Sequence, residues 1–518
     1  MEKNKYQFKK SEGKTRLFMT VSTIFVTLSI FFIAFTKWAL VTFGDLDFEQ
    51  YLFTIAGPTA GTPKEMYIKV AIIVGIVILL IALIMVGVYY FVRQQMYINK
   101  KETGKRVQVL SMSLRKIIVA CVITLFFGFS VYYTNTNLKI STYLLMGESE
   151  FIEGHYIKPT EENIAFPAKK KNLVYIFLES FESTYFSKEL GGANDVNLMP
   201  EMTKLLQEPG AVNFSHQDNY GGMVQTYGSG YSIAGMFAQQ SGLPFKVPGD
   251  GNQYGVENNF IPGARILGDV LHDEGYNLQF LAGADGSFGG VDNLYRTHGN
   301  FDVFDYVRAK KEGKLHEDYW VWWGYEDKKL YEYSKEFMTE LSQRDEPFAI
   351  VIETIDSHFP GGYTDESCST EFDQPYMNSI KCVDSMTADF IRYIQQQPYY
   401  EDTVIVVMGD HLSMDQEYFK TIDPDYERTV FNAFFNVDQS LIDQANTHNR
   451  KASAIDVFPT VLRSMGVDIR GHRLGLGADL YSNQDTLVER YGQQHVHEEL
   501  KKKSVFYMDE FLGQRYEE

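Results

Sequence analysis

The segment NLVYIFLESFESTYF at residues 172–186 decides the fold that we expect. Residues 173–178 are apolar and lack the polar alternation of a half-exposed strand, which is typical of a strand buried on both faces of a parallel sheet. Glu179 follows this run directly, and Ser180 comes next. The segment therefore predicts a central strand with an acidic side chain at its carboxyl end.

Three further apolar runs of strand length follow along the chain, and helical stretches lie between them. They predict strands at 277–281, 348–354 and 403–408, and helices at 263–273 and 377–397. This alternation indicates an α/β domain with a doubly wound, mostly parallel central sheet. In such a sheet ligands bind beyond the carboxyl ends of the strands, so the polar residues at those ends become the candidate site.

Polar side chains also follow the later strands. Asp410 and His411 come one glycine after the strand at 403–408, and His358 follows the strand before it. Any one of them could be an ordinary turn or capping residue, as Asp410 would be at the start of a helix. Glu179, Asp410 and His411 together bring two carboxylates and an imidazole to one sheet edge, which predicts a site for manganese, zinc or magnesium.

A segment rich in glycine and hydroxyl groups offers a nucleophile. It reads YGGMVQTYGSGYSIAGMFAQQSGLPF at residues 220–245, and its candidate hydroxyls are Thr226, Ser229 and Ser232. Ser229 stands between two glycines, which allow a sharp turn and a close approach to a metal or phosphate. A hydroxyl beside a metal loses its proton more readily and becomes nucleophilic. The alternative reading of this segment is a flexible surface loop.

The first 134 residues differ in charge from the rest of the chain. They carry 16 basic and 7 acidic residues, whereas residues 135–518 carry 32 and 60, and the formal net charge is −19. They also contain apolar stretches at 17–40, 70–92 and 117–133, and a membrane-crossing helix needs about 20 apolar residues. The first stretch is too long for a signal peptide, and no small-residue cleavage site follows it. We expect a transmembrane anchor of about three helices within 1–134.

The basic residues beside these stretches predict the orientation in the membrane. Six precede the first stretch and seven lie between the second and third, whereas the loop between the first and second carries four acidic residues. Because cytoplasmic loops are rich in Lys and Arg, the N-terminus is expected in the cytoplasm and the chain beyond about residue 135 outside the cell membrane. A connector at the membrane surface (135–170), a catalytic domain (171–485) and a C-terminal extension (486–518) are expected there.

The composition excludes several classes of protein. The acidic excess argues against nucleic-acid binding, which needs a basic face to neutralise phosphates. Aromatic residues make up 15% of the chain, which argues against extensive disorder. Three cysteines are too few for a disulfide scaffold or a multi-cysteine zinc module.

Four ordered motifs carry a family resemblance. Besides 172–186, they are GSGYSIAGMFAQQSGLP at 228–244, IDSHFP at 355–360 and TVIVVMGDHL at 403–412. With them the chain resembles the lipoteichoic acid synthase and phosphoglycerol transferase family of the alkaline phosphatase–sulfatase superfamily. Within it, the periplasmic glucan phosphoglycerol transferases are most similar. The resemblance covers roughly residues 170–485.

The resemblance implies a two-step transfer. In the family a hydroxyl held by one divalent metal attacks phosphatidylglycerol, diacylglycerol leaves, and an acceptor hydroxyl takes the glycerol phosphate from the enzyme. By position, Glu179, Asp410 and His411 match the metal ligands, and Ser229 stands for the nucleophile, usually Thr, that also contacts the metal. His358 matches the histidine that contacts the substrate. We expect manganese, with magnesium or zinc as alternatives.

One departure from the family bears on the acceptor. The Trp-Asn-Arg stretch that lipoteichoic acid synthases use to hold glycerol phosphate is replaced here by residues 289–291, Gly-Gly-Val, although the neighbouring Phe288 and Asp292 are kept as expected substrate-binding residues. Without that arginine, a single addition to a cell-envelope glycan fits better than polymerisation, and a teichoic-type acceptor stays open. Relatives also carry cysteines near Cys368 and Cys382, so we expect a disulfide there on the external side.

Other functions remain as alternatives. A sulfatase-type hydrolase needs a Cys or Ser followed by Pro and Arg, and Ser229 is followed by Gly-Tyr-Ser-Ile. A phosphodiesterase or two-metal phosphatase needs additional Asp and His ligands. A phosphoethanolamine transferase of the same superfamily and a non-catalytic membrane assembly protein are the remaining readings.

Overall fold

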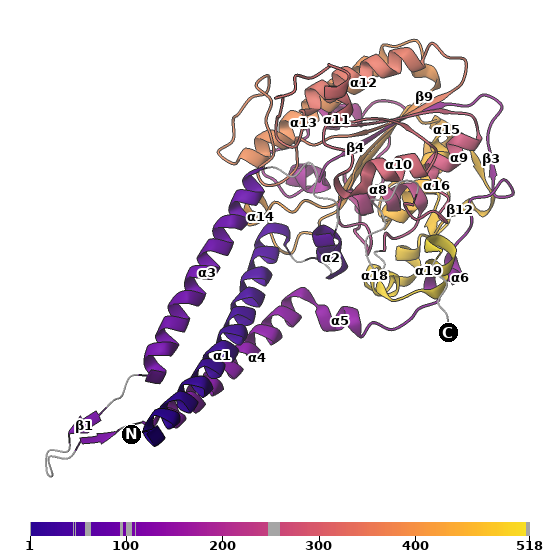
Figure 1. Ribbon diagram of the computed structural model, residues 1–518. Coiled ribbons are helices and arrows are strands. Elements are labelled where there is room, and N and C mark those ends of the chain that lie inside the picture. Colours follow the sequence, from indigo (N-terminus) through magenta and orange to yellow (C-terminus); the bar gives the residue numbers. More distant parts are fainter. Residues whose placement is uncertain are drawn as a thin grey trace. The chain divides into compact units, whose positions relative to one another are not determined.

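The computed structural model describes residues 2–44, 46, 48–56, 64–93, 97–99, 106–108, 110–246 and 259–513. These residues fall into two compact units, a smaller one made of Met1–Tyr51 and Pro63–Leu145 and a larger one made of Leu52–Thr62 and Met146–Glu518. Figure 1 shows both units coloured along the sequence.

Three helices of the N-terminal unit are long and apolar enough to cross a membrane. The apolar spans are Thr15–Phe43 in α1 (Glu2–Phe43), Tyr67–Arg93 in α3 (Lys64–Arg93) and the whole of α4 (Met112–Leu138). They contain the three expected stretches. The shorter elements of this unit are β1 (Tyr97–Asn99), β2 (Arg106–Gln108) and α5 (Ile140–Leu144). The short helix α2 (Phe48–Ala56) begins in this unit and continues into the larger one from Leu52. Lys100, Lys101 and Lys105, which support the expected orientation, lie outside the described residues.

A seven-stranded sheet with the order β5-β10-β9-β4-β8-β6-β7 forms the centre of the larger unit. Five neighbouring strands from β9 to β7 run parallel, β10 pairs antiparallel with β9, and the edge strand β5 pairs antiparallel with β10. The fold is therefore α/β with a mixed, mostly parallel sheet, as predicted. The strands are β4 (Asn172–Leu178), β5 (Gly222–Met223), β6 (Asn277–Ala282), β7 (Asp302–Phe304), β8 (Phe348–Glu353), β9 (Thr403–Gly409) and β10 (Val430–Phe435).

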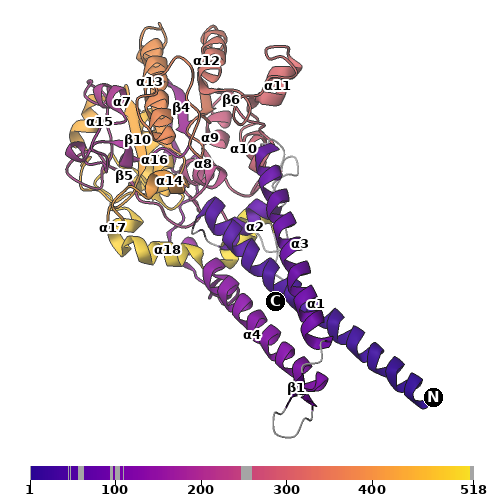
Figure 2. The same ribbon diagram turned by 90° about the vertical axis from the view of Figure 1, so that its left-hand side faces the viewer.

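Helices cover both faces of this sheet, which is why the central strands are apolar on both sides (Figures 1 and 2). Residues of α7, α12 and α13 share one buried cluster with Val174, Ile176 and Leu178. Residues of α8, α9, α10 and α16 share the opposite cluster with Leu173, Tyr175 and Phe177. The helices are α6 (Phe151–His155), α7 (Pro200–Leu205), α8 (Ser232–Ser241), α9 (Leu267–Asp273), α10 (Val291–Thr297), α11 (Tyr306–Lys311), α12 (Asp327–Leu341), α13 (Pro375–Gln395), α14 (Gln416–Phe419), α15 (Gln439–Gln444), α16 (Val457–Ser464), α17 (Leu487–Tyr491), α18 (Gln493–Lys501) and α19 (Val505–Leu512).

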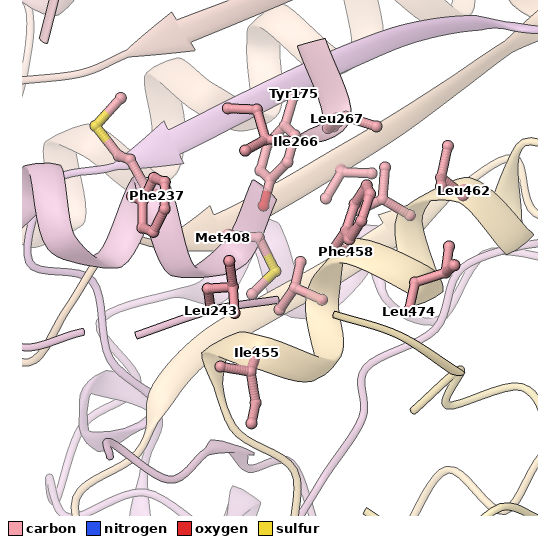
Figure 3. Packing of buried hydrophobic residues seen from close by; sticks show 14 of the residues in the cluster. Tyr175, Phe237, Leu243, Ile266, Leu267, Met408, Ile455, Phe458, Leu462 and Leu474 are labelled. Carbon is pink, nitrogen blue, oxygen red and sulfur yellow. The ribbon is translucent and has the colours of Figure 1, made fainter. Parts of the chain in front are cut away.

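The core that holds α8 against the sheet is shown in Figure 3. Phe237 of α8 and Phe458 of α16 pack in the same buried cluster as Tyr175 of β4 and Met408 of β9. Burial of each such side chain stabilises the fold by about 1.5–3 kcal/mol. This packing matters for function because the two strands and α8 carry the candidate site at their ends.

The C-terminal residues belong to the same unit as the sheet. Helices α17 to α19 follow the short strand pairs β3 (Ile164–Ala165) with β11 (Asp468–Ile469) and β12 (Arg473–Leu474) with β13 (Gly477–Ala478). The backbone of Lys503 is hydrogen-bonded to Gly147 and Ser149, so the loop between α18 and α19 pairs with the segment just after Met146.

Candidate functional site

The carboxyl ends of β4 and β9 bring two acidic residues and a histidine together. The two strands pair in parallel with Leu178 opposite Gly409, so Glu179 and Asp410 emerge side by side. Glu179, Asp410 and His411 are all buried, and one ligand atom from each lies within 4.8 Å of the others. His411 Nε2 lies 3.6 Å from Glu179 Oε1 and 3.4 Å from Asp410 Oδ2.

Local backbone geometry holds this cluster tightly. Ser180 has a positive φ of 54°, which is unusual for a residue other than glycine. In this conformation its N–H donates to Asp410 Oδ1 at 2.7 Å and its hydroxyl donates to Glu179 Oε1 at 2.6 Å. Gly409 allows the close approach, since a Cβ there would lie 2.0 Å from the carbonyl oxygen of Phe181.

The charges of the cluster are strongly coupled. Burial, reinforced by Glu179, raises the pKa of Asp410 to about 7. Burial alone would lower the pKa of His411, but Asp410 and Glu179 raise it above its ordinary value. Burial opposes ionisation of Glu179, yet His358 and His411 lower the pKa of this carboxyl. Two buried carboxylates of this kind are stabilised by a positive charge between them.

The cluster suits a divalent metal ion because it offers a carboxylate oxygen and a ring nitrogen as ligand atoms. Asp410 Oδ2 is buried and receives no hydrogen bond from any residue that the structure describes. His411 Nδ1 lies 2.8 Å from the carbonyl oxygen of Leu412; because a carbonyl only accepts, Nδ1 carries a hydrogen, and Nε2 is the ring nitrogen that can bind a metal. Two carboxylates and an imidazole nitrogen suit manganese, zinc or magnesium.

The hydroxyl beside this cluster belongs to Ser232. Its Oγ donates to Glu179 Oε2 at 3.1 Å and lies 3.3 Å from His411 Nε2. Ser232 is the first residue of α8, and Gly235 one turn later lets the helix reach β9, because a Cβ there would lie 1.9 Å from the carbonyl oxygen of Asp410. The close contact between α8 and the end of β9 therefore places the Ser232 hydroxyl beside the cluster.

The structure places Ser229, the nucleophile expected from the sequence, in a different contact from that of Ser232. Ser229 is buried in the turn before α8, and its hydroxyl donates to the carbonyl of Thr226 at 2.9 Å. Thr226 is also buried, and its hydroxyl has no hydrogen-bond partner among the described residues. Of the three candidate hydroxyls, the one in contact with Glu179 and His411 is that of Ser232, because the start of the helix and not the Gly-Ser-Gly turn faces the cluster.

The expected substrate-binding residues lie on neighbouring loops. The His358 ring packs 4.3 Å from the ring of Trp323, and Trp323 lies 5.6 Å from the ring of Phe288. Burial lowers the pKa of His358, and its Nδ1 lies 2.6 Å from the carbonyl oxygen of Phe359, which leaves Nε2 with a lone pair. Asp292 at the start of α10 pairs with Arg296 at 3.8 Å.

Sequence reasoning missed Trp323. It belongs to the aromatic run YWVWWGY at residues 319–325. This run stands out in the sequence, but the sequence does not show that it lies near His358. The loop is held at the carboxyl edge of the sheet by the backbone pairing of Ala284 with Gly324. Cys368 and Cys382 are joined in a disulfide.

The family is decided by a match over most of the larger unit. The sulfatase family model matches residues 171–467, which is more than half of the chain. The chain belongs to the sulfatase family. The matched range contains every residue of the cluster described above.

Curated relatives of this sulfatase-family protein share a name. Phosphoglycerol transferase I of Escherichia coli O6:K15:H31 (strain 536 / UPEC) is 33% identical over 348 residues, which are 65% of this chain and 42% of the relative. Phosphoglycerol transferase I of Xanthomonas campestris pv. campestris (strain B100) is 32% identical over 322 residues, with 61% and 43% covered. The chain thus spans less than half the length of these relatives.

A solved structure shares the fold of the sulfatase-family chain. The integral membrane protein lipooligosaccharide phosphoethanolamine transferase A from Neisseria meningitidis has a TM-score of 0.51 at 14% identity and covers 88% of this chain and 87% of its own. At this identity the likeness shows the fold alone. The three helices that are long and apolar enough to cross a membrane support a membrane protein.

Proposed function

We propose that the protein is a membrane-anchored phosphotransferase that moves glycerol phosphate from phosphatidylglycerol to a hydroxyl of a cell-envelope glycan or teichoic-type acceptor. The observation that carries the proposal is the Ser232 hydroxyl in contact with Glu179 and His411. The likeness to proteins named phosphoglycerol transferase I supports this chemistry.

Glu179, Asp410 and His411 would hold one divalent metal ion, and we propose manganese, with magnesium or zinc as the alternatives. When bound, such an ion supplies positive charge that favours the deprotonated hydroxyl and offsets the charge on the phosphate oxygens. Ser232 is the nucleophile in this proposal, in place of Ser229.

In the first step Ser232 Oγ attacks the phosphorus, the phosphorus–oxygen bond to diacylglycerol breaks, and glycerol phosphate remains as an ester on Ser232. The proton that Ser232 loses ends on the departing diacylglycerol oxygen, and His358, which is expected to contact that oxygen, is proposed to deliver it. In the second step an acceptor hydroxyl gives its proton to His358 and attacks the same phosphorus, and Ser232 leaves with that proton. Phe288, Asp292 and Trp323 contact the substrates.

We place the catalytic domain outside the cytoplasm, at the outer leaflet where the donor lipid is available. The basic residues before the first span and the disulfide between Cys368 and Cys382 support this side, because disulfides persist in oxidising compartments. A single addition is favoured over polymerisation because residues 289–291 lack the family arginine.

The test uses full-length protein in detergent with phosphatidylglycerol labelled in its headgroup, manganese and no acceptor. We expect release of diacylglycerol together with labelled protein, and EDTA abolishes both. Absence of diacylglycerol with manganese, magnesium and zinc contradicts phosphatidylglycerol as donor. Release from phosphatidylethanolamine instead identifies the related phosphoethanolamine chemistry.

A further inference from the structure

A third carboxylate, that of Glu182, stands outside the cluster and is fully buried. Its Oε2 accepts hydrogen bonds from Arg428 Nε at 3.0 Å and from the Thr184 hydroxyl at 2.6 Å, and its Oε1 accepts from Arg428 Nη2 and from the N–H of Ser413 at 2.6 Å. Arg428 therefore forms a bidentate ion pair with Glu182, and bidentate pairs are the strong, oriented form of an Arg–carboxylate interaction.

Arg428 is itself held in place. Its Nη2 also donates to the carbonyl of Ser413 at 2.7 Å, and its guanidinium lies 3.5 Å from the centre of the Phe419 ring. Stacking and bidentate pairing use properties that Lys lacks. Both backbone groups of Ser413 are thus fixed by this ion pair.

The peptide group between Leu412 and Ser413 connects the ion pair to the cluster. Its N–H donates to Glu182, whereas its carbonyl oxygen accepts the hydrogen of His411 Nδ1 at 2.8 Å. The two bonds run in one direction, from His411 through the peptide group to a carboxylate. Such a chain polarises its members and fixes the ring orientation and tautomer of the histidine.

We infer that Glu182, clamped by Arg428, is a positioning residue that aims His411 Nε2 at the metal through the Leu412–Ser413 peptide group and so sets the affinity for the divalent ion. The inference rests on the metal site of the proposed function, not on its donor or acceptor. Its failure is therefore distinguishable from failure of the transfer reaction.

The chain offers a matched control in the pair Arg450–Glu489. Arg450 is buried, and it also binds its carboxylate through two contacts, Nε to Oε1 at 3.0 Å and Nη2 to Oε2 at 3.2 Å. Both residues stand on segments that carry none of the three metal ligands. Loss of this pair reports the stability effect of a broken ion pair without the connection to His411.

The experiment titrates full-length, EDTA-stripped protein in detergent with Mn²⁺ and follows free Mn²⁺ by its EPR signal, alongside the Tm of each apo variant. We expect Glu182→Gln to raise the Kd for Mn²⁺ by about 10–100-fold, the usual effect of losing a partner behind a metal ligand. Glu489→Gln lowers the Tm and leaves the Kd within about threefold of the wild type, since ion-pair loss alone acts on folding.

A second variant covers the case in which Glu182→Gln does not fold. Arg428→Lys keeps the positive charge but loses the forked contact, so a smaller rise in Kd is expected. An unchanged Kd in the folded variants, an equal rise in Glu489→Gln, or a wild type that binds no Mn²⁺ overturns the inference.

Discussion

The hydroxyl of Ser232 donates to Glu179 Oε2 across 3.1 Å, which joins the first residue of α8 to the carboxyl end of the central strand β4. His411 completes this group, because its Nε2 lies 3.3 Å from the Oγ of Ser232. This contact distinguishes the three hydroxyls of the segment 226–232, and the first prediction follows from it.

Ser232→Ala removes the attacking oxygen and is expected to abolish protein labelling from headgroup-labelled phosphatidylglycerol. Ser229→Ala, the matched control, is expected to retain labelling, because among the described residues the Ser229 hydroxyl bonds only the carbonyl of Thr226. Labelled peptides mapped by mass spectrometry check the site. Label that survives in Ser232→Ala and disappears in Ser229→Ala would restore the choice made from sequence.

Metal binding should stabilise the folded protein. Mn²⁺ at about 100 times its Kd is expected to add about 2.7 kcal/mol, seen as a higher Tm that EDTA reverses. Asp410→Asn should lose this response without lowering the Tm of the metal-free protein, because burial and Glu179 already disfavour the Asp410 charge. An undiminished Mn²⁺ response in Asp410→Asn argues against this ligand set.

Gly235→Ala should disturb the site through sterics alone. The added Cβ would lie 1.9 Å from the carbonyl oxygen of Asp410, so α8 must move away from β9. We expect a lower Tm and loss of labelling at Ser232. Gly154→Ala in α6 is the control, since nothing lies within 4 Å of its new Cβ and Ala favours helix. Equal behaviour of the two variants contradicts the close-approach argument.

Asp384, which is not part of the cluster, is expected to make the stability of the folded protein depend on pH. Its carboxylate accepts the free N–H groups of Glu201 and Met202 at the start of α7, and burial raises its pKa to about 7. Because the folded state holds the Asp384 proton more tightly than the unfolded state does, protonation of Asp384 favours folding. This contribution to stability is fully present below the pKa of the unfolded state, near 4, and is lost as the pH rises to the folded-state pKa of about 7. The loss is at most about 4 kcal/mol.

Asp384→Asn removes this ionisation. The Tm difference between variant and wild type, measured by differential scanning fluorimetry, should therefore shift in favour of the variant from pH 4 to pH 7. The Asn amide can satisfy only one of the two N–H groups, so a constant offset is added at every pH. A difference that does not change with pH would show that Asp384 stays ionised.

The cysteines provide a check on the compartment. The chain has three, of which Cys368 and Cys382 are bonded and Cys121 in α4 is free. Denatured protein from native membranes should bind one maleimide–polyethylene glycol without reductant and three after reduction, read as gel shifts. Three additions without reductant would contradict an oxidising location for the domain.

The architecture and most of the cluster follow from the sequence, for a local reason. A run such as 173–178 has no polar face and can be satisfied only between two layers of helices, and residues just past parallel strands meet at one edge. Glu179, Asp410 and His411 could therefore be placed together before the structure was known. The strand β10, which lies between β9 and the edge strand β5 and runs antiparallel to both, was not predicted, since a single apolar run does not reveal its direction.

Only the tertiary structure decided which hydroxyl meets these residues. Ser229 and Ser232 are three positions apart, about one helical turn, and the choice depends on where α8 begins and how closely Gly235 lets it approach β9. The contacts of Trp323 with His358 and of Glu182 with Ser413 likewise join segments far apart in the chain. Local patterns specify strands and their ends, whereas side-chain contacts between loops are set by packing across the whole sheet.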